Sequence, residues 1–88
     1  MTERTIEIVN SLGLHARPAA QFVRLAAGFS SEIELARDEM SVNGKSIMGV
    51  MMLAAECGSS VVVRATGADE EAEVAALEAL IRNGFGET

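Results

Sequence analysis

The stretch TIEIVNSLGLHARPAAQFVRLAA, Thr5 to Ala27, contains a change of hydrophobic period that decides the fold. At its start two isoleucines flank a glutamate over positions 6–8, which predicts a half-buried strand covering residues 2–9. Residues 10–13 then bring in turn-forming side chains, which end this strand. The first unit of the predicted fold is therefore a strand, a short turn and a helix.

The helix predicted over residues 16–27 is amphipathic. Its apolar side chains recur at i, i+3, i+4 and i+7 and form one stripe, made of Ala19, Phe22, Val23 and Ala26. A different face carries Arg17, Gln21 and Arg24. We expect Gly28 to end the helix as a left-handed cap.

The rest of the chain predicts three more strands. Residues 32–35 and 40–42 form short strands joined by a hairpin at 37–39. The segment SVVVRAT, residues 60–66, is the strand with the highest β-branched content. All of these strands are half polar, which is typical of a sheet with one buried face.

Two further helices follow from the spacing of apolar residues. The second begins after Ser46, a good N-cap, and Gly58 closes its segment. Its predicted inward set is Ile47, Val50, Leu53 and Ala54. The last helix buries Val74, Leu77 and Ile81 and ends at Asn83-Gly84. Its polar ends, which match the helix dipole, are Asp69, Glu70, Glu71 and Glu73 at the start and Arg82 at the finish.

These elements follow the order β-α-β-β-α-β-α and favour an α+β fold. Three amphipathic helices and half-polar strands predict two layers, with the helices on one face of an open antiparallel sheet. At 88 residues the chain is expected to form one domain, residues 1–88.

Composition excludes several classes of function. Seven basic against 13 acidic residues give a formal charge of −6, which argues against general nucleic-acid binding. Cys57 is the single cysteine, so no intramolecular disulfide is expected, as suits a reducing cytosol. No leader or membrane-spanning run is recognisable. One histidine and one cysteine cannot form a zinc site. We therefore expect a cytoplasmic protein that has no metal or cofactor and does not insert into membranes.

The single histidine, His15, is the strongest candidate for chemistry. It falls at the N-cap or first position of the first helix, where free backbone N–H groups and the dipole favour an anion such as phosphate. Arg17 adds a permanent charge that pairs with phosphate oxygens, Pro18 fits the first turn, and Gly13 permits a backbone that projects the ring outward. Neutral imidazole is a nucleophile near physiological pH, so a covalent phosphohistidine fits this site. Two alternatives stay open from local physics alone: a plain surface cap, and general acid–base catalysis, for which nothing indicates a deep pocket.

Three segments together resemble one family. LGLHARPAA (Leu12–Ala20) resembles the active-site signature of the histidine-containing phosphocarrier protein, HPr, family of the bacterial phosphoenolpyruvate-dependent sugar phosphotransferase system. NGKSIMGVMML (Asn43–Leu53) resembles its second-helix signature, and TGADEEAEVAALEALI (Thr66–Ile81) its last helix. The resemblance spans nearly the whole chain and implies an antiparallel sheet of strand order 1-4-2-3.

The resemblance also implies roles for individual residues. His15 would accept a phosphoryl group on Nδ1 from phosphorylated enzyme I and pass it to enzyme IIA components, with Arg17 binding the phosphate. Ser46 would be a regulatory site for HPr kinase/phosphorylase, and a transcriptional regulator is a further possible partner. The chain would be a covalent carrier and not an enzyme with turnover of its own, and a monomer is expected because one face meets successive partners.

A docking face is predicted around the histidine. Methionine is more often a core residue, but the second helix has more methionines than its inward face needs, which suits adaptable contacts. The residues assigned to partner contacts are Leu14, Ala20, Ile47, Met48 and Met51, with Arg17 and Arg24 as a basic rim. Ala54 departs from the family, where glycine is common at the end of the second helix. Cys57 is expected to be an inert thiol.

Two other functions remain as alternatives. One is the nitrogen-related paralogue of HPr, which would share the chemistry but have regulatory partners; Ser46 within SIMGVM favours the sugar branch. The other is a non-catalytic α/β interaction domain in which His15 has no chemical role.

Overall fold

Strands and helices follow one another along the chain in the predicted order. The structure, a computed structural model, describes residues 1–87. Its elements are β1 (Thr2–Glu7), α1 (Ala16–Ala27), β2 (Glu32–Arg37), β3 (Met40–Asn43), α2 (Ile47–Met52), β4 (Ser60–Thr66), α3 (Glu70–Arg82) and a 3-10 turn, η1 (Gly84–Gly86). No helix among these residues is long and apolar enough to cross a membrane.

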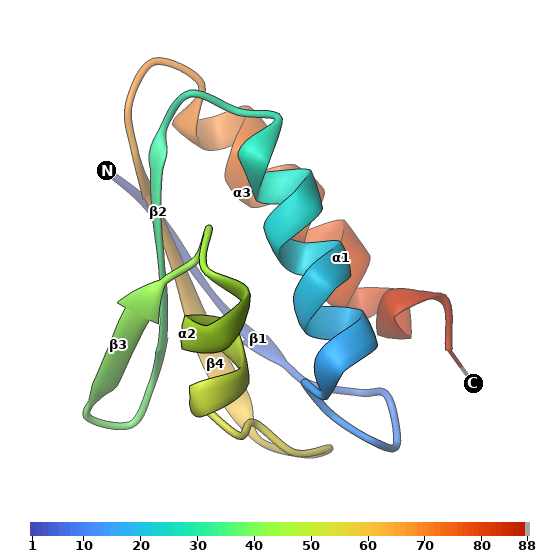
Figure 1. The fold of residues 1–88 in the computed structure, drawn as a ribbon. Coiled ribbons are helices and arrows are strands. Elements are labelled where there is room, and N and C mark those ends of the chain that lie inside the picture. Colours follow the sequence, from blue (N-terminus) through green and yellow to red (C-terminus); the bar gives the residue numbers. More distant parts are fainter. Residues whose placement is uncertain (88) are drawn as a thin grey trace.

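The strands form one open antiparallel sheet in the order β1-β4-β2-β3, which confirms the order implied by the resemblance. The central strand β4 pairs Val61 with Ile6 of β1 and Val63 with Leu35 of β2. The three helices lie on one face of this sheet (Figure 1), so the predicted two-layer α+β architecture is confirmed.

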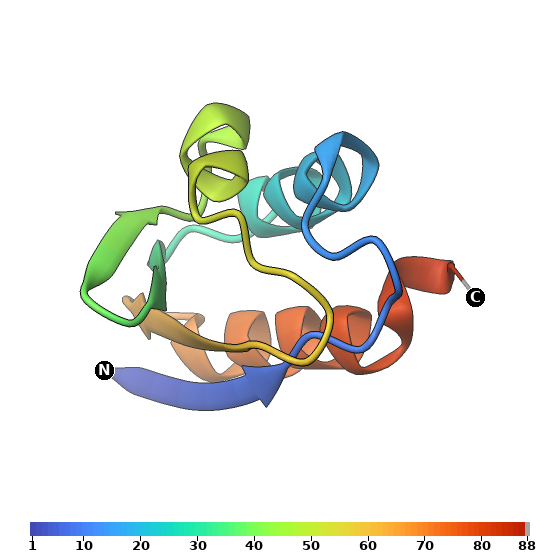
Figure 2. The ribbon, with the colours of Figure 1, turned by 90° about the horizontal axis from the view of Figure 1, so that it is seen from below.

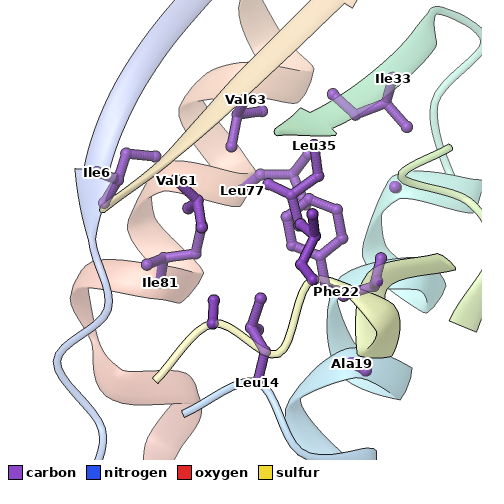
Figure 3. Close-up of a cluster of buried hydrophobic side chains, with 14 of the residues drawn as sticks. Ile6, Leu14, Ala19, Phe22, Ile33, Leu35, Val61, Val63, Leu77 and Ile81 are labelled. Carbon is purple, nitrogen blue, oxygen red and sulfur yellow. The ribbon is translucent and has the colours of Figure 1, made fainter. Parts of the chain in front are cut away.

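The core lies between the sheet and the helices. Strand residues that face inward are fully buried, among them Ile6, Leu35, Val61 and Val63, and they meet side chains from α1 and α3 (Figure 3). Helix α1 contributes Phe22 and α3 contributes its predicted stripe, Val74, Leu77 and Ile81. The opposite face of the sheet is polar: Arg64 of β4 bonds Glu3 at 2.8 Å and lies 3.6 Å from Glu34. The alternation in the sequence therefore predicts correctly which side chains of the strands face the helices and which face away from them.

The predicted left-handed cap at Gly28 is wrong. Gly28 has a right-handed backbone, with φ −76° and ψ −6°. The end of α1 tightens instead, because Gly28 N–H donates to Leu25 O and Phe29 N–H donates to Ala26 O, both at 3.1 Å. These bonds satisfy the last carbonyl groups, so no left-handed residue is required at this position.

The inward face of α2 differs from the prediction. Val50 and Leu53 are buried, but Ile47 is 44% exposed and Ala54 lies outside the helix and is also exposed. The helix ends at Met52, so helical spacing no longer applies at Ala54, which takes a left-handed φ of +51°. The chain then turns inward at Ala55, which is buried.

The start of α3 has functions beyond matching the dipole. The Asp69 carboxylate accepts hydrogen bonds from the backbone N–H groups of Ser30 and Ser31 and from the Ser31 hydroxyl, which ties α3 to the loop after α1. These hydrogen bonds lower the pKa of Asp69 to about 2. Glu73, expected on the polar side, is fully buried.

Candidate functional site

His15 is the N-cap residue of α1, as predicted. Its backbone is extended, with φ −78° and ψ −171°, and its side chain makes no capping hydrogen bond. The first helical hydrogen bond runs from Ala19 N–H to His15 O at 3.0 Å. Ala16 and Arg17 precede this bond, so their N–H groups are the orphan donors of the helix start. Pro18, which is buried, also precedes it and therefore sacrifices no helical hydrogen bond.

The turn before the histidine is fixed by close backbone contacts. Gly13 has φ +68°, and a Cβ there would clash with the carbonyl oxygen of Ala55 and lie 2.9 Å from the Cα of Glu56. The next residue, Leu14, donates its N–H to Ala55 O at 2.8 Å. Glycine is thus required at position 13 both for its left-handed backbone and for this close approach to the loop after α2.

Leu14 does not belong to the docking face, which corrects the prediction. Its side chain is only 4% exposed and lies in the hydrophobic cluster (Figure 3). Leu14 immediately precedes the N-cap, a position from which an apolar side chain commonly packs back onto its helix. It anchors the turn that carries His15 and leaves the ring at the surface.

Glu87 and Asn10 are the residues of the site that the sequence did not indicate. The Glu87 carboxylate lies 3.0 Å (Oε2) and 3.3 Å (Oε1) from His15 Nε2, and it accepts a 3.1 Å hydrogen bond from Asn10 Nδ2. The chain end after α3 lies beside the loop before α1 (Figure 2). No local sequence pattern indicates a contact between residues 72 positions apart, and the sequence indicates the buried Asn10 only as a turn-forming residue.

The Glu87 carboxyl is held in its charged form. Burial raises its pKa, but hydrogen bonds from Asn10 and His15 and the positive charge of Arg17 oppose this, and the net result is a pKa below the ordinary value. A carboxylate can only accept hydrogen bonds, so the facing nitrogen, His15 Nε2, carries the hydrogen.

The exposed surface beside the ring is shallow and charged. A small pocket there is lined by Ser11, Leu12, His15, Arg17, Gly86 and Glu87. The His15 side chain is 37% exposed and Arg17 is exposed. Arg17 and the free N–H groups at the start of α1 therefore supply the positive side of this site, and Glu87 supplies its negative side.

Ser46 is the N-cap of α2, as predicted. Its hydroxyl accepts a 3.1 Å hydrogen bond from Gly49 N–H. Helices α1 and α2 lie side by side (Figures 1 and 2), so Ser46 and His15 begin neighbouring helices.

The remaining residues of the predicted docking face fall on α1 and α2. Met48 is 74% exposed, and Ile47 and Met51 are exposed to 44% and 42%. On α1, Arg24 is exposed and Ala20 is half-buried. Cys57 is an exposed loop thiol whose Sγ lies 3.7 Å from Val9 O.

Comparison with known proteins gives the family. The family model described as "PTS HPr component phosphorylation site" matches residues 2–83. The chain belongs to the HPr family. The phosphocarrier protein HPr of Cupriavidus necator is 49% identical over 87 residues, which cover 99% of this chain and 98% of that protein. A crystal structure of HPr from Thermoanaerobacter tengcongensis is similar with a TM-score of 0.96 at 52% identity, covering 100% of this chain and 99% of that one.

Membership of the HPr family establishes the general role. The chain is a phosphocarrier of the phosphotransferase system, a carrier of phosphoryl groups. A second Thermoanaerobacter tengcongensis HPr structure, described as a dimer, has a TM-score of 0.79 at 53% identity, covering 99% of this chain and 100% of that one. The monomer expected for this HPr family member stays a prediction.

Proposed function

We propose that this phosphocarrier accepts a phosphoryl group on Nδ1 of His15 from phosphorylated enzyme I and passes it to enzyme IIA components. The observation that carries the proposal is the set of groups around the His15 imidazole. The His15 side chain makes no capping hydrogen bond to α1, its Nε2 faces the Glu87 carboxylate, and Arg17 lines the same pocket. In a neutral imidazole whose Nε2 carries the hydrogen, the lone pair is on Nδ1, which makes Nδ1 the nucleophile.

The start of α1 suits a phosphoryl group on that nitrogen. Orphan N–H groups of Ala16 and Arg17, the positive end of the helix and the Arg17 guanidinium can all meet phosphate oxygens. Phosphoryl transfer needs little more from a protein than positioning and charge stabilisation. The shallow, open pocket also suits a group that a partner's active site must reach.

Labelling with phosphoenolpyruvate and enzyme I tests this proposal. The native chain should form an acid-labile, base-stable phosphoprotein, and His15→Ala should abolish it. Arg17→Ala should slow transfer in both directions by about tenfold or more, which corresponds to the loss of one charge-assisted contact. Arg4→Ala removes an exposed arginine on β1 and serves as the matched control. Labelling that persists in His15→Ala would contradict the assignment.

We propose that the exposed apolar side chains of α2 dock these partners. Met48 is the most exposed of them, and methionine packs adaptably against different surfaces. Met48→Glu should raise the KM of enzyme I for this chain several-fold and leave the fold intact. Met40→Glu changes a methionine on β3 that is 46% exposed, and it should leave KM unchanged. Equal effects of the two variants would argue against a docking role for α2.

Phosphorylation of Ser46 by HPr kinase/phosphorylase is proposed as the regulatory step. Ser46 precedes the exposed Ile47 and Met48, so a phosphate would add a charge of about −1.5 to −2 at the edge of the proposed docking face. An ATP-dependent, acid-stable label should appear on the native chain and be absent from Ser46→Ala. If Ser46→Ala is labelled equally, the site has been assigned to the wrong residue.

A further inference from the structure

Asn10 and Glu87 form a hydrogen-bonded support for the histidine from segments at opposite ends of the chain. Asn10 is 2% exposed, and its Nδ2 group bonds Gly13 O at 2.8 Å and Glu87 Oε1 at 3.1 Å. Both partners are acceptors, so both hydrogens of the amide nitrogen are used and the amide orientation is fixed. Asn10 thereby holds the Glu87 carboxylate against His15 Nε2.

We propose that Glu87 is a positioning residue for phosphoryl transfer, which keeps a proton on His15 Nε2 throughout the reaction. This inference rests on the function proposed above and adds a role for the residue that the ring contacts. The carboxylate meets Nε2 with both oxygens, at 3.0 and 3.3 Å, and its side chain is 19% exposed, so water competes weakly for the contact. The support fixes both the tautomer and the direction of the ring.

The transfer step follows from this arrangement. The lone pair of Nδ1 attacks phosphorus, the bond between phosphorus and the donor's leaving atom breaks, and that atom keeps the bonding electron pair. Nε2 retains its proton, so the phosphorylated ring carries a positive charge that the Glu87 carboxylate balances. When the phosphoryl group moves on, the Nδ1–P bond breaks and its electron pair returns to Nδ1. A ring protonated on Nε2 leaves as a neutral imidazole, which is a better leaving group than an anion.

Two charged groups act on the ring in opposite directions. Glu87 attracts the positive charge that the ring carries once Nδ1 is phosphorylated, whereas Arg17, in the same pocket, repels that charge. Removing the Glu87 charge alone therefore leaves Arg17 unopposed and should favour loss of the Nε2 proton. A carboxylate with no role in transfer would instead hinder the reaction, because it repels the incoming phosphoryl group.

The pH profile of transfer to an enzyme IIA separates these two effects. In Glu87→Gln, the pH above which transfer slows should be lower than in the native chain, since one opposite charge near the phosphorylated ring is lost. Transfer above that pH should be about tenfold slower through kcat with little change in KM. Glu87→Asp, which keeps the charge, should restore part of the profile. Glu71→Gln, which removes an exposed carboxylate of α3, is the matched control and should behave as native.

Nitrogen-15 NMR of the unphosphorylated chain gives a readout that is independent of transfer. The native His15 ring should show a hydrogen-bonded Nε2–H and an unprotonated Nδ1, and Glu87→Gln should weaken that Nε2–H signature. A Glu87→Gln variant with the native pH profile, or with faster transfer, overturns the role of Glu87. If the native chain takes no label from phosphoenolpyruvate and enzyme I, the proposed phosphohistidine function itself fails.

Discussion

Replacing the buried glutamate of α3 should stabilise the protein. Glu73 is fully buried, and neither carboxylate oxygen has a hydrogen-bond partner within residues 1–87. Burial raises the pKa of Glu73; the positive charge of Lys45 counteracts this only in part, and Asp69 adds to the rise. Glu73 is thus a polar side chain shielded from water, and no hydrogen bond within the described residues satisfies its oxygens. Glu73→Met keeps a similar length and removes both polar atoms.

The expected gain follows from the cost of an unsatisfied buried polar group. Such a group destabilises a fold by about 1–3 kcal/mol. With two unpartnered oxygens and no exposed area, Glu73→Met should raise the free energy of unfolding by about 2 kcal/mol at pH 7. For a chain of this size, that gain corresponds to a rise in Tm of roughly 8–16 °C.

The gain should depend on pH in a direction that the pKa of Glu73 decides. A raised pKa means that the folded chain binds a proton more tightly than the unfolded chain. The free energy of unfolding contributed by Glu73 therefore falls as the pH rises above the ordinary glutamate value of about 4.3, until the raised pKa is passed. The difference between Glu73→Met and the native chain should widen from pH 4 to pH 8.

Denaturant unfolding followed by far-ultraviolet circular dichroism is the appropriate assay, because the chain has no Trp or Tyr to report by fluorescence. Glu71→Met, at an exposed position in the first turn of α3, should change stability by no more than about 0.5 kcal/mol. A stability difference that shrinks or reverses with rising pH would refute the reasoning. It would show that Glu73 is ionised and paired with Lys45.

Three further substitutions, one of them with a matched control, test the backbone and the start of α3. Ala54→Gly should raise the free energy of unfolding by about 1 kcal/mol in denaturant titration, because Ala54 has φ +51°; Ala79→Gly, in the middle of α3, should lower it by about as much. Gly13→Ala should destabilise by about 2 kcal/mol or more, and retention of native Tm would mean that the contact with Ala55 is not tight. Asp69→Ala should lower the Tm at pH 7, and the difference from native should vanish as the pH falls from 4 towards 2, since a lowered carboxyl pKa stabilises only above that range. A difference in Tm that persists at pH 2 would contradict this.

The hydrophobic period predicted the helices and strands because most of them are long enough for the repeat of buried apolar residues to be visible in the sequence. The strand alternation and the stripes of α1 and α3 placed the core correctly. Helix α2 has six residues, less than two turns, so spacing could not decide between Ile47 and the residues that actually pack inward. The strand order followed from the resemblance, since no pairwise pattern in one sequence fixes which strands pair.

In the candidate site, too, the sequence predicted the residues that depend on local signals and missed those that depend on distant contacts. His15, Arg17 and Ser46 were placed correctly because helix starts have local signals. Glu87 was missed because its contact depends on where the chain goes after α3, and Glu73 because a glutamate near a helix start is usually solvated. The burial of Leu14 shows that a residue adjacent in sequence to a surface histidine can belong to the core.

The pairing of β1 with β4 has a consequence for how the chain folds during synthesis. Every partner of β1 in the sheet lies in Ser60–Thr66, whereas the β2–β3 hairpin and α1 are built from neighbouring residues. The ribosome must therefore release most of the chain before β1 can join the sheet, and such long-range pairing is the slow class of folding event. Until then the hairpin and the helices can form, but the segment that carries His15 has no strand to anchor it. Capture of β1 by β4 is the step expected to limit the rate at which a competent phosphocarrier appears.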